Sequence, residues 1–411
     1  MLRQFLNAIT KIFDLPAWFK TIRSTEGDTG YPLRLVAALV LVGALLQTRS
    51  LEQLERWSRR GRFKRFGIGP ISADTIRRRL AQIPPMVWHQ LGQQVGRKLA
   101  RNRAWTRIAG LRVVALDGVE LFVQHSVDCR ECLHRIKNER TEWFHRIVVA
   151  STVGPRRQAV LEWESVHPAD GSDKNEGEST AAYRLMATLY RHYHHQIEVI
   201  VADALYCNRV FLQKVLDYGW QAVVRLKDER LTILQDVKGL LKQALPVVTR
   251  QWEQECLQIW DFPGLSWGSM NNLRVIYWTR TVTKHQRGKK HRGQTVTTVY
   301  HGWALTTCGP AVSAETVWQI MHHRWDLENC IFRQGKSTGK LAHCFGHDPA
   351  IIEALVGAQL LALTWWIWWS TRDILCPDLA KAPRSDLLER ARESLGFLRT
   401  SYQGWWCLQS T

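Results

Sequence analysis

The chain has 411 residues, of which 45% are hydrophobic, and its 56 lysines and arginines against 37 acidic residues give a formal net charge of +19. This length allows two or three domains with a substantial core, and this composition excludes a disordered or fibrous chain. The charge favours a polyanionic partner, of which nucleic acid is the simplest large example, although basic proteins of other classes exist.

Residues 1–110 are expected to be helical and to form a DNA-binding region. The first residues, MLRQFLNAITKIF, lack a continuous apolar stretch with a cleavage site, so we expect no signal peptide. Leu51, Leu54 and Trp57 follow helical spacing. Three basic clusters either contact phosphates or form ordinary solvated helix faces: residues 59–65, 77–79 and 97–107.

A mixed α/β region is predicted after Gly110, where β-branched residues begin to dominate. The order of three strands, a helix, a strand, a helix and a strand indicates a mixed sheet covered by helices. The predicted strands are 111–123, 144–153, 159–167, 198–202 and 221–227, and the predicted helices are 178–194 and 209–218.

A β-rich insertion is predicted over residues 231–307, where short strands with turn signals such as 273–283 and 295–306 replace the α/β pattern. Between these two strands, residues 284–293 read Lys-His-Gln-Arg-Gly-Lys-Lys-His-Arg-Gly. We expect a basic hairpin tip that holds DNA, with three cations as the main phosphate contacts: Lys289, Lys290 and Arg292.

Helix is predicted again over residues 313–340, with Ser313 as the capping residue. Residues 35–46 and 354–369 are strongly apolar, but both runs fall short of the roughly 18 residues that a membrane-spanning helix needs. They are interpreted as buried core helices of a chain with no membrane partner. The nine cysteines, an odd number, do not indicate a secreted disulfide framework, so we expect a protein of the reducing cytoplasm.

Two aspartates each end a predicted buried strand. Asp117 follows Val-Val-Ala-Leu and Asp203 follows Val-Ile-Val-Ala. Burying a carboxylate is costly unless it is paired or bound to metal, and open α/β sheets place their sites at such strand ends. Asp is also a common capping residue, so each strand on its own fits a site and a cap equally well.

A third carboxylate lies in the predicted helix 313–340. Arg324 and Glu328 are four residues apart and share a helix face, either within a site or as an exposed ion pair. Asp326, two residues from Glu328, points elsewhere and is the weaker candidate for a metal ligand.

Three segments, taken in order, resemble the motifs of DDE transposases from bacterial insertion sequences: Val-Ala-Leu-Asp117-Gly, Val-Ala-Asp203-Ala-Leu-Tyr-Cys-Asn and His-Arg324-Trp-Asp-Leu-Glu328-Asn. Their flanks match as well, so the resemblance covers most of the chain. It implies a ribonuclease H-like core in which Asp117, Asp203 and Glu328 are the catalytic residues. It also implies that they bind two Mg²⁺ or Mn²⁺ ions, which prefer oxygen ligands.

The implied activity is hydrolytic cleavage at transposon ends, followed by transfer of the freed 3′-hydroxyl into target DNA. The implied partners are the double-stranded DNA of the ends and of the target, with a homodimer in the synaptic complex and association with the bacterial nucleoid when DNA is bound. Two alternatives remain open. One is a ribonuclease H-like nuclease without strand transfer, and the other is a catalytically decayed protein that still binds element ends.

The resemblance also assigns the domains. Residues 111–230 are the first part of the catalytic core, 231–307 are the insertion, 308–372 are the rest of the core with the Glu-bearing helix, and 373–411 are a C-terminal tail.

The signature of this family around its glutamate is Tyr-x2-Arg-x3-Glu-x6-Lys. Arg324 and Glu328 fit it, whereas Met321 replaces the tyrosine and Gly335 stands at the lysine position. Lys336 follows one residue later, which turns it about 100° around the axis of an α-helix. Arg324 and Lys336 are expected to make accessory contacts to DNA phosphates.

One further motif is Cys129-Arg-Glu-Cys132, with His125, His134 and His145 nearby. Zinc binding at Cys129 and Cys132 is one interpretation. A structural zinc ion needs four ligands and only one cysteine pair is present, which favours reduced cysteines in a loop.

Overall fold

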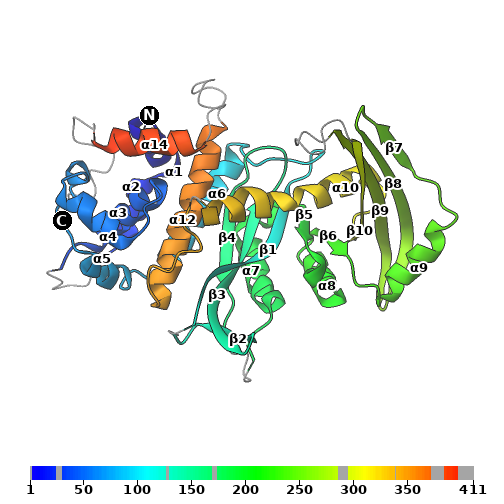
Figure 1. The fold of residues 1–411 in the computed structure, drawn as a ribbon, viewed down its shortest axis with the longest axis horizontal. Helices are drawn as coiled ribbons and strands as arrows, with labels where there is room; N and C mark the ends of the chain where they lie inside the picture. The colour runs from blue at the N-terminus through cyan, green and yellow to red at the C-terminus, as the bar shows by residue number, and fades with distance from the viewer. Residues whose placement is uncertain are drawn as a thin grey trace.

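A computed structural model of residues 1–411 gives the fold (Figure 1), and it describes residues 2–24, 30–125, 129–168, 174–285, 295–337, 339–371 and 384–396. The hairpin cations Lys289, Lys290 and Arg292 lie outside the described residues.

Helices form the N-terminal region, as the sequence predicts. They are α1 (Leu2–Phe13), α2 (Leu15–Thr21), α3 (Leu33–Leu45), α4 (Leu51–Arg59), the 3-10 turn η1 (Lys64–Phe66), α5 (Ala73–Leu80) and α6 (Pro85–Arg101). Ser50 and Ser72 begin α4 and α5 by accepting hydrogen bonds from backbone amides of the first turn, as good capping residues do.

A single mixed sheet forms the centre of the molecule, with strand order β2-β3-β1-β5-β6-β10-β9-β8-β7 and β4 paired to β3. β1 runs parallel to β5 and β5 to β6, whereas β3 is antiparallel to β1 and to β4. The first strands are β1 (Val113–Gln124), β2 (Leu133–Lys137), β3 (Arg140–Thr152), β4 (Val160–Ser165), β5 (Val199–Ala202) and β6 (Gln221–Leu226). The fold class is therefore the predicted α/β, ribonuclease H-like one, with β2 as an additional strand.

The helices between these strands also match the predicted order. α7 (Glu178–Tyr193) and the 3-10 turn η2 (His194–Gln196) precede β5, and η3 (Ala204–Tyr206) and α8 (Arg209–Asp217) follow it. α7 packs on β3 and β4, while α8 packs on β6 and α7. The sheet is thus covered by helices, and the ends of β1 and β5 are held in a fixed frame.

The region 231–307 differs from the predicted short strands in two ways. It begins with a helix, α9 (Thr232–Leu241), and most of its strands are long: β7 (Val248–Gln251), β8 (Glu255–Trp267), β9 (Met270–His285) and β10 (Thr295–Thr306). β10 pairs antiparallel with β6, so these strands extend the central sheet (Figure 1, right). The sheet is continuous because β10 and β6, which are far apart in sequence, are joined by hydrogen bonds. Patterns of neighbouring residues cannot predict such a pairing.

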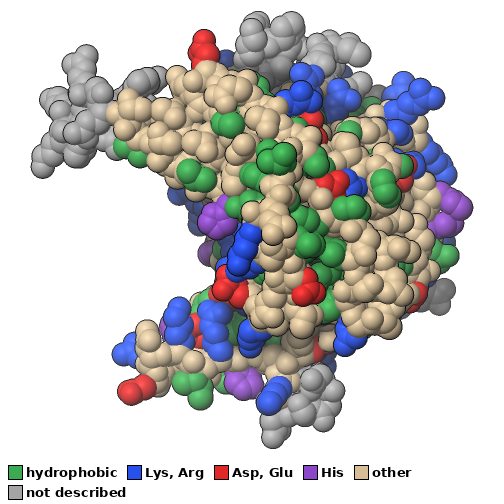
Figure 2. All heavy atoms as spheres, turned by 90° about the vertical axis from the view of Figure 1, so that its right-hand side faces the viewer, with side chains coloured by type: hydrophobic (Ala, Val, Ile, Leu, Met, Phe, Trp, Pro, Cys, Tyr) green, Lys and Arg blue, Asp and Glu red, His purple; other side chains and the backbone are tan. Residues whose placement is uncertain are grey.

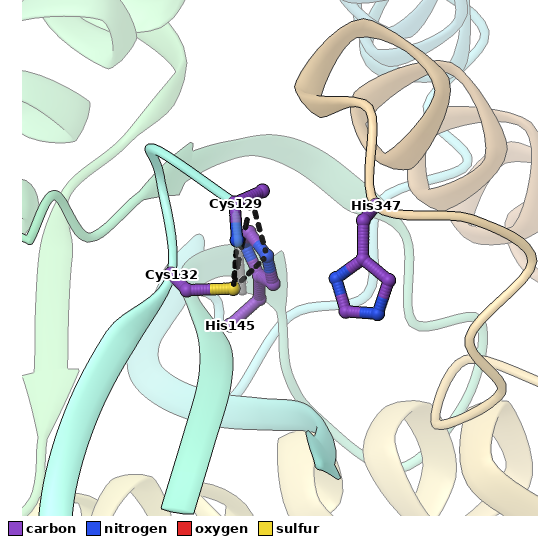
Figure 3. Close-up of side chains that lie close together, drawn as sticks. All are labelled: Cys129, Cys132, His145 and His347. Atoms are coloured by element: carbon purple, nitrogen blue, oxygen red, sulfur yellow. Dashed lines mark hydrogen bonds between the residues drawn. The ribbon is translucent and has the colours of Figure 1, made fainter. Parts of the chain in front are cut away.

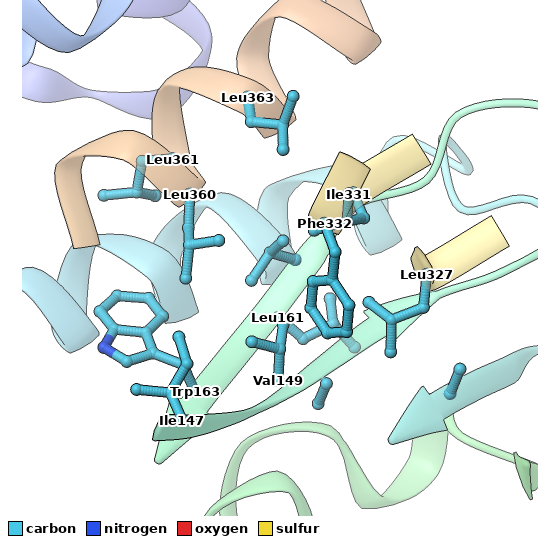
Figure 4. Packing of buried hydrophobic residues seen from close by; sticks show 14 of the residues in the cluster. Ile147, Val149, Leu161, Trp163, Leu327, Ile331, Phe332, Leu360, Leu361 and Leu363 are labelled. Carbon is cyan, nitrogen blue, oxygen red and sulfur yellow. The ribbon is translucent and has the colours of Figure 1, made fainter. Parts of the chain in front are cut away.

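The helix predicted over residues 313–340 is present over 314–337, but it is not a regular α-helix throughout. The structure has α10 (Ala314–His323), a turn at Arg324, a π-helical turn η4 (Leu327–Phe332) and α11 (Arg333–Ser337). Leu327, Ile331 and Phe332 are all buried, and Figure 4 shows them over Val149 and Leu161 of the sheet. In an α-helix Phe332 would be turned about 140° from Leu327. A wider turn brings both of their side chains onto the buried face.

Helix α12 (Pro349–Ser370) lies between the N-terminal helices and the sheet, where it packs on α3, α5, α6 and β4 (Figure 1). Its 22 residues make it long and apolar enough to cross a membrane, so the expectation of a shorter run is wrong on length. In its most apolar window, however, 83% of the residues are buried inside the protein, and the Trp366 indole donates to the Leu45 carbonyl over 2.8 Å. It is a core helix, as predicted.

Part of the C-terminal segment is also folded. Helix α14 (Arg384–Gly396) lies against α1, and Arg392 donates to the carbonyl oxygens of Leu46 and Gln47 over 2.8 and 3.0 Å.

Candidate active site

Asp117 and Asp203 lie on neighbouring parallel strands at the same level. Asp117 is within β1 and Asp203 directly follows β5, and the register pairs the residues just before them, Leu116 and Ala202. Adjacent strands lie about 4.8 Å apart, so the two aspartates leave the sheet side by side.

Each aspartate also has local hydrogen bonds. Asp117 Oδ1 accepts from the Gly118 amide over 2.9 Å, and Asp203 Oδ1 accepts from the Leu205 amide over 2.8 Å as the cap of η3. Asp203 therefore caps a turn and lies beside Asp117 at the same time, so the two interpretations of this residue do not exclude each other.

Arg324 connects Asp117 to Glu328. Its Nη1 is 3.0 Å from Asp117 Oδ2 and its Nη2 is 2.8 Å from Glu328 Oε1. The Arg324 side chain is only 6% exposed, whereas that of Glu328 is 45% exposed. From the sequence, Arg324 and Glu328 could also form an exposed ion pair. In the structure Arg324 is buried and binds two carboxylates, that of Asp117 on β1 and that of Glu328 on η4.

Burial raises the pKa of Asp117 to about 7. The Arg324 guanidinium lowers this pKa, and the nearby carboxylates of Asp203, Glu328 and Glu178 raise it further. Asp203 and Glu328, the other two carboxylates predicted from the sequence, thus both act electrostatically on Asp117, which requires each of them to be close to it in space.

Glu178, the first residue of α7, is a fourth acidic residue of this site that the sequence reasoning missed. Its carboxylate accepts from the Tyr206 hydroxyl over 2.9 Å and lies 3.6 Å from an Arg146 guanidinium nitrogen. A Cβ atom added to Gly118 would overlap the Glu178 carboxylate, so any larger residue there requires the Glu178 side chain to move. Gly118 beside Asp117 is the sequence signal of this close approach.

A further missed residue is Arg225 on β6. Burial lowers its pKa, Arg324 lowers it further and Asp203 raises it, so this half-buried cation lies near both residues. Nothing in the local pattern of β6 distinguishes it from an ordinary strand residue.

The signature positions that follow Glu328 are rearranged by the π-helical turn. Gly335 is buried, with Leu341 3.2 Å from where its Cβ would be, whereas Lys336 is exposed. A π turn holds one residue more than an α turn, so it compensates for the one extra residue between Glu328 and Lys336. The rotation of about 100° expected for Lys336 assumed a continuous α-helix and does not apply. At the tyrosine position, Met321 is buried in the core.

Asp326 points away from Glu328, as predicted. It accepts hydrogen bonds from the Gly154 amide over 3.0 Å and from His323 Nδ1 over 2.8 Å. Its role is to hold the loop after β3 against the Glu-bearing helix.

One of the basic clusters has a structural member. Arg79 is buried and donates to the Tyr31 carbonyl over 2.7 Å, so it is not available to a phosphate.

Cys129 and Cys132 lie between β1 and β2, in hydrogen-bond contact with His145.

The carboxylates of Asp117 within β1, of Asp203 directly after β5 and of Glu328 on η4 are an oxygen-only set of ligands, which suits hard divalent cations. The expectation that Asp117 ends its strand is wrong, because β1 continues to Gln124. Burial is the main cause of the raised pKa of Asp117, and the charges of Asp203 and Glu328 add to it, so a cation here would stabilise the ionised carboxylate. The residues present therefore fit Mg²⁺ or Mn²⁺.

A family model described as the transposase DDE domain matches residues 110–365. The match begins just before β1 and ends in α12, and it contains Asp117, Asp203 and Glu328. Comparison with curated proteins gives no match. Because the family model covers more than half of the 411 residues, the chain belongs to the transposase DDE domain family.

Proposed function

We propose that the chain cleaves DNA at the ends of an insertion sequence and transfers the freed 3′-hydroxyl into target DNA, with Asp117, Asp203 and Glu328 as the catalytic residues. The observation that carries this proposal is the pair of aspartates on neighbouring parallel strands, with Arg324 between Asp117 and Glu328. Asp203 lies at the carboxyl end of β5, where open α/β sheets usually place their sites, and Asp117 lies beside it on β1.

Asp117, Asp203 and Glu328 would hold Mg²⁺ or Mn²⁺, two ions by the resemblance. When bound, these ions supply a hydroxide-like nucleophile and stabilisation of the leaving oxygen at the scissile phosphate. The raised pKa of Asp117 means that cation binding at neutral pH displaces a proton from part of the molecules.

The chain's own cations would orient the DNA around these carboxylates. Arg324 fixes the carboxylates of Asp117 and Glu328 relative to each other. Arg225, half-buried near Asp203, and the exposed Lys336 would contact phosphates of the bound DNA.

The shape of the molecule supports a DNA-binding role. Figure 2 shows a deep hollow in one side of the molecule, with lysine, arginine and histidine side chains on its wall and lower edge. A concave face with basic side chains attracts and holds a phosphate backbone. Two copies of the chain, one on each element end, would form the synaptic complex.

The test is a cleavage and joining assay on element-end DNA with Mg²⁺ or Mn²⁺, beside a DNA-binding assay without metal. We expect Asp117→Asn, Asp203→Asn and Glu328→Gln each to lose cleavage and joining by orders of magnitude. DNA binding should persist or tighten, because a negative charge near phosphate has been removed.

Asp326→Asn is the matched control. The asparagine keeps an oxygen for the Gly154 amide, and the side chain points away from Glu328, so activity should be retained. Robust cleavage by Glu328→Gln would contradict the proposal that Glu328 is a catalytic residue. Cleavage by the unmodified chain without joined product would favour the nuclease, and metal-independent binding without cleavage would favour a decayed DNA-binding protein.

A further inference from the structure

A second group of metal-binding side chains lies away from the carboxylates. It consists of Cys129 and Cys132 between β1 and β2, His145 on β3 and His347 just before α12. One ligand atom from each residue lies within 4.8 Å of the others. Figure 3 shows the two cysteines and His145 gathered together, with the His347 ring facing them from the other side.

The distances match those of a tetrahedral zinc site. The two sulfurs are 3.6 Å apart, and His145 Nε2 lies 3.4 Å from Cys129 Sγ and 3.3 Å from Cys132 Sγ. Zinc–ligand bonds of ordinary length at tetrahedral angles require about 3.8 Å between two sulfurs and about 3.6 Å between sulfur and nitrogen. The sulfur separation also far exceeds the roughly 2.05 Å of a disulfide, so both cysteines are thiols.

His347 has the hydrogen bond that a metal-ligating histidine needs. Its Nε2 is 2.6 Å from Gln124 Oε1, which fixes the ring and places the proton on that nitrogen. Its Nδ1 is buried and has no hydrogen-bond partner among the described residues. A buried ring nitrogen with its lone pair unused is costly, and a metal ion at the centre of the group would remove that cost.

We propose that Cys129, Cys132, His145 and His347 bind one structural Zn²⁺ ion. Two thiolates and two neutral imidazoles form a closed tetrahedral set with no position left for substrate. Binding releases the two thiol protons to solvent, and no oxidation is involved.

The ion would fasten segments that are far apart in sequence. Cys129 and Cys132 follow β1, the strand that carries Asp117, whereas His347 lies between the Glu328-bearing helix and α12. A zinc ion there would join the segment after β1 to the segment between α11 and α12.

The test measures zinc in the full-length chain after purification without chelator, by mass spectrometry of the metal content. We expect about one zinc ion per chain. Cys129→Ser and His347→Asn should each lower the zinc content about tenfold or more after dialysis. Cys256→Ser and His343→Asn are matched controls, because they change the same residue types and lie outside the group of four.

Two measurements on the unmodified chain keep the test independent of folding in the variants. Co²⁺ added to the metal-free protein should give the charge-transfer and visible bands of a tetrahedral thiolate site. Zinc should also protect Cys129 and Cys132, rather than Cys207 or Cys256, from alkylation.

Absence of bound zinc together with absence of the cobalt bands would overturn the proposal, as would equal zinc content in Cys129→Ser, His347→Asn and the controls. Asp117→Asn should retain zinc, so this result separates the structural ion from the proposed catalytic ions.

Discussion

At the scale of single residues, the carboxylate of Glu178 fills the space that a side chain on Gly118 would need. The glycine follows Asp117, so a shift of the backbone there moves the Asp117 carboxylate, which we propose to be catalytic, as well. The contact therefore couples the N-terminus of α7 to the active site.

We predict that Gly118→Ala lowers the cleavage rate about tenfold or more and costs about 1–3 kcal/mol of stability, because its Cβ would overlap the Glu178 carboxylate. Gly177→Ala is the control, since no atom lies within 4 Å of its added Cβ. Cleavage rates and thermal melting are measured for both. Shortening the opposing side chain in Gly118→Ala/Glu178→Ala should recover part of the stability. Identical effects of Gly118→Ala and Gly177→Ala would contradict this account.

His89 is a second residue whose environment has a measurable consequence. Burial lowers its pKa, but the hydrogen bonds that His89 donates to Glu162 at 2.5 Å and to Glu353 at 3.0 Å outweigh this effect and raise the pKa to about 10. The charged imidazole thus joins α6, β4 and α12 through one ion-pair group.

The folded state holds the His89 proton more tightly than the unfolded chain, in which the pKa of His89 is about 6.5. The contribution of His89 to the free energy of unfolding should therefore be fully present below pH 6.5 and should be lost as the pH rises toward about 10. We predict that His89→Gln lowers the free energy of unfolding by roughly 3–5 kcal/mol near neutral pH, since two buried carboxylates lose their charged partner. Denaturant unfolding at several pH values measures this. A difference between the two proteins that does not shrink at high pH would be inconsistent with a charged His89.

At the scale of elements, the sequence predicted the order of the core strands and helices because each has a strong local pattern. The apolar runs before Asp117 and Asp203 and the cap at Ser313 depend on neighbouring residues alone. The pairing of β10 with β6 depends on residues about 80 positions apart, so the insertion could not be recognised as part of the same sheet.

The site shows the same division. Asp117, Asp203 and Glu328 were predicted from their strand and helix contexts and from the family resemblance. Glu178 and Arg225 could not be, because a glutamate at a helix start and an arginine in a strand are ordinary residues until the fold brings them near Asp203. His347 likewise reaches Cys129 only through the packing that places it before α12.

The π-helical turn leads to a prediction for Lys336. Because the turn compensates for the extra residue, we expect Lys336→Ala to lower the cleavage rate about tenfold and to reduce the salt dependence of end binding by about 0.9 in slope, as loss of one phosphate contact does. Lys242→Ala, an exposed lysine at the end of α9, is the control. Indistinguishable rates and slopes for the two variants would show that Lys336 does not contact DNA.

At the scale of the whole molecule, the net charge of +19 predicts DNA affinity that falls steeply with salt, with a slope of about −0.9 per phosphate contacted. Replacing Lys289, Lys290 and Arg292 by alanine should reduce that slope by up to about 2.7 and should leave metal-dependent cleavage at saturating protein. Mobility-shift titrations at several salt concentrations measure both. Salt-independent affinity would remove nucleic acid as the main partner, and an unchanged slope in the triple variant would make the hairpin an ordinary solvated loop.

The packing of α3 on α12 also determines when the chain can finish folding. Leu45 and Trp366, which share a hydrogen bond, are 321 positions apart, and α3 is apolar on nearly all its faces. During synthesis, α3 can therefore pack on α12 only after almost the entire chain has left the ribosome. Contacts between residues so far apart in sequence also form slowly. A copy of the gene that ends before residue 349 would leave α3 uncovered. Its product should aggregate or be degraded, so broken copies of the element would not yield a soluble fragment that competes for DNA.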